Sequence, residues 1–153
     1  MDLKKEGISE LIAQYKGDVE KLVKYLPWLE QNNLKNLKSD YNPDEGGGVT
    51  TIKVPVYDST LLAFIKVAKT TSFMNKNYIY TFSRNGLKTT KDELRFIEKC
   101  QIMDIEKLGD ILSKYVLKGM SKATLWTEGM EAGVYYAVVK KMKELIEFWS
   151  MPM

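Results

Sequence analysis

The chain has 153 residues, of which 44% are hydrophobic and 28% charged, and its formal net charge at pH 7 is +3. This size and composition fit one ordinary domain with a buried core, over residues 1–153; they exclude a membrane protein and argue against a fully disordered chain. Histidine is absent and there is one cysteine, which excludes histidine-based catalytic triads, histidine metal ligands, an intrachain disulfide and a cysteine zinc cluster.

The N-terminal third predicts helices followed by a loop. Apolar residues at helical spacing predict a helix over 8–15, and Gly17 interrupts the pattern. Asp18 is then in position to cap a second helix, which Pro27 should kink or end. Residues 40–48 finish in three glycines after Pro, Asp and Glu, and they predict the one obvious flexible loop.

The middle of the chain has extended character. Residues 49–57 are rich in β-branched side chains, although Pro55 restricts such a segment to the edge of a sheet. A helix over 61–68 follows. Aromatic and polar residues alternate over 78–82, as is typical of a short strand. We therefore expect a small extended or β-hairpin element around residues 49–83.

Further along the chain, capping signals predict two helices. Residues 90–93 read as a capping box that begins a helix reaching about Cys100. Asp104 is placed to cap the next helix, and Gly119 is placed to end it. A buried helical position suits Cys100, so a core cysteine is favoured over a reactive thiol.

The C-terminal region predicts a short helix between Ser121 and Gly133 and a long helix over 134–149. The fold class is therefore mainly α, a single compact domain of five to seven helices. Apolar residues step by three and four along the last helix, at Tyr135, Val138, Met142, Leu145 and Trp149. This seam covers only about two heptads, so burial in the domain's own core is favoured and a homodimer through 134–149 is the alternative.

One candidate site is a stripe of lysines. Lys114, Lys118 and Lys122 step by four, and on a continuous helix they would form a phosphate-facing surface for nucleic acid. The favoured alternative is a solvated helix face, because acidic residues dilute the stripe and Gly119 interrupts the helix. Lysine is also a poor bidentate reader of phosphate and guanine.

A second candidate site lies around Trp126. Glu128 and Glu131 are three residues apart, so they share a helix face and could bind a cation or a substrate. General acid–base catalysis also needs a desolvated cleft with shifted pKa values. Ordinary surface carboxylates are the favoured interpretation. The acids at Asp92, Glu93 and Asp104 are expected to be helix caps.

Three classes of function follow from these residues. A non-catalytic binding or protein-interaction module with an unidentified protein partner is preferred, because the domain is compact, lacks histidine and has mixed charge. A nucleic-acid-associated protein that uses the C-terminal lysine-rich face is one alternative, and a small carboxylate-based enzyme or ligand-binding protein is the other. We expect no catalytic residue, cofactor, metal or membrane partner. The polar N-terminus lacks a signal peptide and the cysteine is single, so a cytoplasmic location is expected.

Residues 50–149 also carry a pattern of short motifs. These are a Pro-x-Tyr segment before a helix, an aromatic pair, a basic-Gly step, and a Leu-Trp stretch that leads through a glycine into a terminal helix, here at Pro55–Asp58, Tyr78–Tyr80, Lys118–Gly119 and Leu125–Trp149. In this layout the chain resembles an uncharacterised bacterial family known only as a domain of unknown function. Ser121, Lys122 and Thr124 stand where that family has Arg-Phe and a following glycine. The resemblance implies a helical fold and a bacterial or phage-type cytoplasmic origin, with no known activity.

Overall fold

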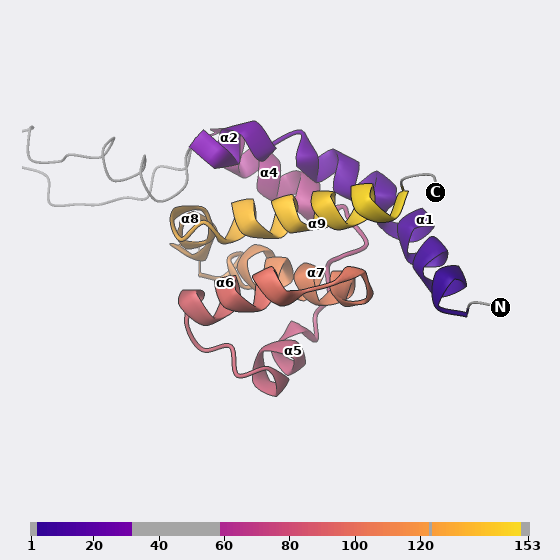
Figure 1. The fold of residues 1–153 in the computed structure, drawn as a ribbon. Helices are drawn as coiled ribbons and strands as arrows, with labels where there is room; N and C mark the ends of the chain where they lie inside the picture. Colours follow the sequence, from indigo (N-terminus) through magenta and orange to yellow (C-terminus); the bar gives the residue numbers. More distant parts are fainter. Residues whose placement is uncertain (1–2, 32–58, 123, 151–153) are drawn as a thin grey trace, which may run out of the picture.

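A computed structural model describes residues 3–31, 59–122 and 124–150, and within these ranges the chain is helical and contains no strand (Figure 1). The mainly α prediction is confirmed, but the described ranges contain eight α-helices rather than five to seven, because the segment expected to be extended at 78–82 is helical. The elements are α1 (Leu3–Val23), α2 (Leu26–Gln31), α4 (Ser59–Lys69), α5 (Tyr78–Arg84), α6 (Thr90–Lys99), the 3-10 turn η2 (Ile102–Asp104), α7 (Ile105–Ser113), the π-helix η3 (Lys114–Lys118), α8 (Thr124–Glu131) and α9 (Val134–Ser150). None of the described helices is both long and apolar enough to cross a bilayer.

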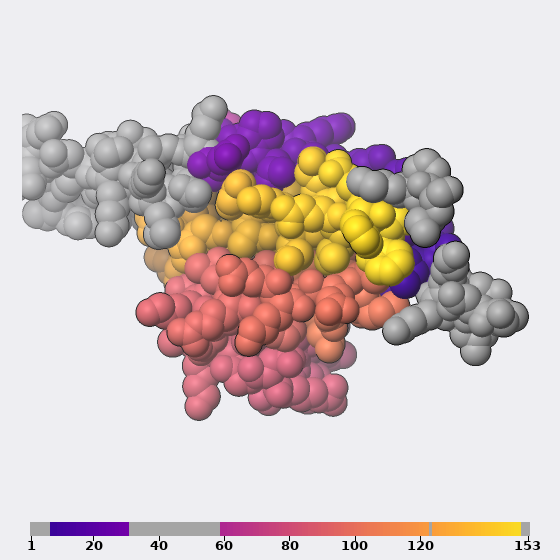
Figure 2. Space-filling view, in the orientation of Figure 1, coloured from indigo at the N-terminus to yellow at the C-terminus, as the bar shows by residue number. Residues whose placement is uncertain are grey.

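Helix α9 connects most of the other described helices, and one side of it lies on the surface (Figure 2). It packs against α1, α2, α6, α7 and α8, and Figure 1 shows it running antiparallel to α1 across the molecule. The predicted helix over 134–149 is confirmed, and its seam is buried as far as Met142. Leu145 is half-buried and Trp149 is 42% exposed. Residues seven apart are displaced by about 20° around a straight α-helix. The seam residues near the C-terminal end of α9 therefore point away from the core, and Ile146 is buried there instead.

Helix α1 is continuous through Gly17, so the predicted interruption is wrong. Buried Tyr15 and Val19 lie on either side of this glycine, and their contacts outweigh the roughly 1 kcal/mol by which glycine disfavours a helix. Asp18 is not a cap, because its carboxylate accepts the backbone N–H of Ser72 at 2.9 Å. The predicted break at Pro27 is confirmed, since α1 ends before it and Pro27 lies in the first turn of α2.

Residues 78–82 form α5 rather than a strand. The side chains of Tyr78 and Phe82 stand four residues apart on one face, with ring centroids 6.2 Å apart. Thr81 Oγ1 donates to Asp110 Oδ2 of α7 at 2.6 Å, so the helix is fixed by contacts with α7 that local alternation does not reveal. The predicted loop at 40–48 and the extended segment at 49–57 lie outside the described residues.

The capping boxes lie close to the predicted places but use other residues. The N-cap of α6 is Thr89, whose hydroxyl accepts the N–H of Asp92 while the Asp92 carboxylate accepts the N–H of Thr89. The backbone N–H groups of Lys88 and Thr89 both donate to the Asp92 carboxylate, and these hydrogen bonds lower its pKa. Asp104 is the N-cap residue of α7, as predicted, but its carboxylate makes no cap hydrogen bond to α7 and accepts the N–H of Gln101 before η2 instead.

The predicted helix from Asp104 to Gly119 is divided. Its second part is the π-helix η3, which ends at Gly119 as predicted. Gly119 has an ordinary φ of −61°; a side chain is excluded there because the Trp126 ring fills the space where a Cβ would lie. Ser121 does not cap α8, because its hydroxyl donates to the carbonyl of Lys118 at 3.2 Å. Gly133, with φ +78°, supplies the left-handed turn before α9.

Candidate functional site

The lysine stripe does not form one face. Lys114 turns inward, where its Nζ lies 2.9 Å from Oε2 of Glu93 and 5.0 Å from the centroid of the Phe82 ring. Lys118 and Lys122 are exposed. A π-helix has more residues per turn than an α-helix, so residues four apart around η3 do not share a face.

Glu93 is the centre of a buried polar cluster, and its assignment as a helix cap is wrong. Its side chain has no exposed surface, and Oε1 accepts the hydroxyl of Tyr115 at 2.5 Å. Burial and the nearby Glu93 carboxylate raise the pKa of Tyr115 far above its ordinary value. Both carboxylate oxygens are engaged by η3, so the cluster joins α6 to η3.

A second buried carboxylate, Asp110, binds the segment between α4 and α5. Asp110 is 8% exposed and accepts the side-chain amide of Asn75 at 2.8 Å and the hydroxyl of Thr81 at 2.6 Å. Ser113 Oγ, one turn further along α7, accepts the backbone N–H of Asn75 at 2.9 Å. We did not predict this role from the sequence, although one signal was available: Asp110 stands within the apolar run of α7.

The second candidate site, around Trp126, is held by packing. Trp126 Nε1 donates to the carbonyl of Val116 at 3.1 Å and the ring covers Gly119. Glu128 and Glu131 share α8 as predicted, but both are exposed. In the described ranges, no group of three or more acidic or cysteine side chains is placed to hold a metal ion.

Cys100 lies in the core, as predicted. It is 5% exposed, and burial raises the pKa of its thiol to about 12. The thiol is therefore protonated at neutral pH and is a poor nucleophile.

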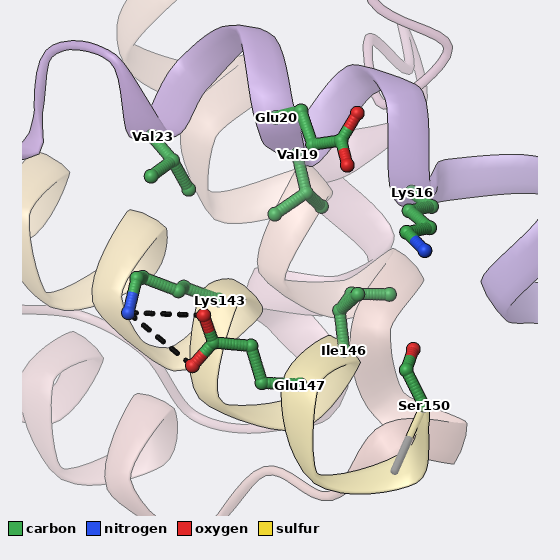
Figure 3. Close-up of a pocket in the computed structure, with 8 residues that line it drawn as sticks. All are labelled: Lys16, Val19, Glu20, Val23, Lys143, Ile146, Glu147 and Ser150. Carbon is green, nitrogen blue, oxygen red and sulfur yellow. Dashed lines mark hydrogen bonds and ion pairs between the residues drawn. The ribbon is translucent and has the colours of Figure 1, made fainter. Parts of the chain in front are cut away.

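The described surface has a groove between α1 and α9, with a volume of about 540 Å³ (Figure 3). Its floor is apolar, and its rim carries charges of both signs. The floor residues are Val19, Val23 and Ile146; the rim residues are Lys16 and Glu20 on α1, and Lys143 and Glu147 on α9, with Ser150 at one end. None of the predicted site residues lines this groove.

Each wall of the groove presents one lysine and one glutamate four residues apart. On α9, Lys143 Nζ lies 3.1 Å from Oε2 of Glu147, as the dashed lines in Figure 3 mark. Val19 is 3% and Ile146 is 5% exposed, so Val23, which is half-buried, supplies most of the open surface of the floor. The formal charges of the rim cancel. Such a surface suits small apolar side chains flanked by charges of both signs. We did not predict the groove, because the two walls are more than a hundred residues apart.

No family model, no curated protein and no solved structure matches the chain. The resemblance to a bacterial domain of unknown function stays a prediction.

Proposed function

We propose that the chain is a non-catalytic protein-interaction module of a bacterial or phage-type cytoplasmic protein, and that it receives a partner helix in the groove between α1 and α9. The observation that carries the proposal is the groove itself, with its floor of small apolar residues and its four-charge rim. Two antiparallel helices form a groove between them, and the side-chain ridge of a third helix can pack into that groove. The partner segment is an amphipathic helix with small apolar residues on one side and both lysine and glutamate beside them.

The buried polar groups support a non-catalytic role. Glu93 and Asp110 are engaged by neighbouring side chains, and these bonds hold helices together. The carboxylate alternative rests on Glu128 and Glu131, which are exposed, whereas general acid–base catalysis needs carboxylates in a desolvated cleft. The nucleic-acid alternative relied on a lysine stripe that included Lys114, but Lys114 points inward and forms an ion pair with Glu93.

Site-specific photo-crosslinking in cells that naturally make the chain tests the proposal. A photo-reactive residue in place of Glu20, on the groove wall, should crosslink to peptides of one partner protein. The same residue in place of exposed Lys118, which is outside the groove, is the matched control and should not. Adding Val23→Asp, which puts a charge on the floor beside the core, should abolish the crosslink while the chain remains folded at the temperature of the experiment. Equal crosslinking from both positions, or none from Glu20, contradicts the proposal.

A further inference from the structure

One side of α9 carries a stripe of residues that is separate from the groove; of its two apolar members, Ala137 packs against the core and Phe148 is exposed. Its members are Ala137, Lys141, Glu144 and Phe148, which step by four, three and four residues and so lie within one narrow strip of the helix. Phe148 is 63% exposed and Glu144 is exposed, while Ala137 and Lys141 are half-buried. Figure 2 shows α9 as a band across this face of the molecule.

The stripe is complementary to itself in the reverse direction. When a second copy is rotated by 180° so that the two α9 helices run antiparallel, Lys141 of each copy faces Glu144 of the other. The same register places Phe148 over Ala137, because Ala137 precedes Lys141 by four residues and Phe148 follows Glu144 by four. The dimer then contains two contacts between Phe148 and Ala137, a large and a small side chain, and two between Lys141 and Glu144, a cation and an anion.

We propose that a second copy of this chain docks on the stripe, with the two α9 helices antiparallel and related by a two-fold axis. An isologous interface requires this self-complementarity, and the exposed Phe148 gains an apolar contact in it. Helix α9 has 17 residues and is about 26 Å long. One helix pair buries less than the roughly 800 Å² per partner of a standard stable interface, so the dimer is weak and depends on concentration.

This surface differs from the seam that predicted a homodimer from the sequence. The residues of that seam are buried as far as Met142, and the core covers them. The stripe also leaves the groove open, because Lys143 and Ile146 lie on another side of α9. A dimer can therefore form whether or not the groove binds a partner helix.

Sedimentation equilibrium, from about 5 µM to about 500 µM protein, tests the proposal. The apparent mass of the native chain should rise toward twice the monomer mass. Glu144→Lys should raise the dissociation constant at least about tenfold, because two attractive contacts become repulsive, and Lys141→Glu should do the same. The double variant Lys141→Glu/Glu144→Lys restores opposite charges across the interface and should return the constant to within about threefold of the native value.

Two further variants complete the test. Phe148→Ala removes an exposed side chain, so it should weaken the dimer at least about tenfold with little change in melting temperature. Glu131→Lys makes the same charge reversal as Glu144→Lys, but on α8, and should leave the dissociation constant unchanged. A chain that is monomeric across the whole range overturns the proposal. So does a dimer in which the double charge-swapped variant is as weak as either single variant, or in which Phe148→Ala has no effect.

Discussion

The ammonium of Lys114 lies 2.9 Å from Oε2 of Glu93, and this ion pair joins η3 to α6. The Glu93 side chain has no exposed surface, whereas that of Lys114 is 22% exposed. Desolvation of such a pair offsets most of the attraction between its charges, but removing one partner leaves an uncompensated buried charge. The pair therefore makes the junction between α6 and η3 sensitive to mutation.

Lys114→Met should lower the free energy of unfolding by about 3 kcal/mol, because it leaves the buried Glu93 carboxylate without its cation. Urea denaturation measures the change. Lys118→Met is the matched control: Lys118 is in the same π-helix but exposed, so its loss should change stability by less than about 0.5 kcal/mol. Equal effects of the two substitutions would show that the ion pair contributes no more to the free energy of unfolding than an exposed lysine does.

Two buried tyrosines should respond in opposite ways to loss of the hydroxyl group. Tyr115 donates its hydroxyl to Glu93, so Tyr115→Phe leaves a carboxylate oxygen unsatisfied and should destabilise the fold by about 1–3 kcal/mol. Tyr135 is equally buried, and its hydroxyl has no hydrogen-bond partner in the described part of the chain. Tyr135→Phe should therefore be neutral or stabilising. A destabilisation by Tyr135→Phe as large as that by Tyr115→Phe would contradict this assignment.

Two helical glycines should also differ. A Cβ at Gly109 in α7 would lie 2.7 Å from Cδ1 of Phe73, and Phe73 cannot retreat easily because its ring stacks on Tyr15 at 4.5 Å. Gly109→Ala should lower stability by about 1–3 kcal/mol. Nothing lies within 4 Å of a Cβ at Gly17, so Gly17→Ala should raise stability by about 0.5–1 kcal/mol. Thermal melting of the two variants should thus give shifts of opposite sign.

The sequence predicted what depends on local pattern. Helix α9, the helix break at Pro27 and the burial of Cys100 each follow from periodicity, backbone chemistry or residue type, and the structure confirms them. The class of fold follows in the same way, because several segments carry a helical period.

What could not be predicted depends on contacts between distant segments. Residues 78–82 alternate as a strand would, yet Thr81 binds Asp110 and the segment is helical. Lys114 and Glu93 are 21 residues apart in the sequence. The local pattern around each residue predicts only a surface lysine and a helix cap, and their ion pair depends on the packing of η3 against α6. The groove is the extreme case, because its walls come from opposite ends of the chain.

Cys100 gives the chain a sensitivity to alkali that begins below the range of its tyrosines. Burial raises the pKa of the thiol from 9.0 to about 12, whereas Tyr15, buried beside Glu106, has its pKa raised from 10.0 to about 12. In both cases the folded chain holds a proton that the unfolded chain releases. The contribution of each of these two groups to stability therefore falls as the pH rises above its unfolded pKa, and that loss is complete near pH 12.

Because the unfolded thiol titrates about one pH unit before the unfolded tyrosines, Cys100 contributes about half of the decline in stability between pH 9 and pH 10. Over that interval the free energy of unfolding of the native chain should fall by about 1 kcal/mol from the thiol alone. Cys100→Ala should remove the thiol's part of the decline and keep the part that Tyr15, Tyr115 and Tyr135 cause, which begins below pH 10 and continues above it. Urea denaturation at four pH values, about 1 unit apart from pH 8 to pH 11, measures how stability changes with pH in the native chain and in the variant. Parallel curves for the two proteins between pH 9 and pH 10 would mean that the thiol ionises as readily in the folded core as in the unfolded chain.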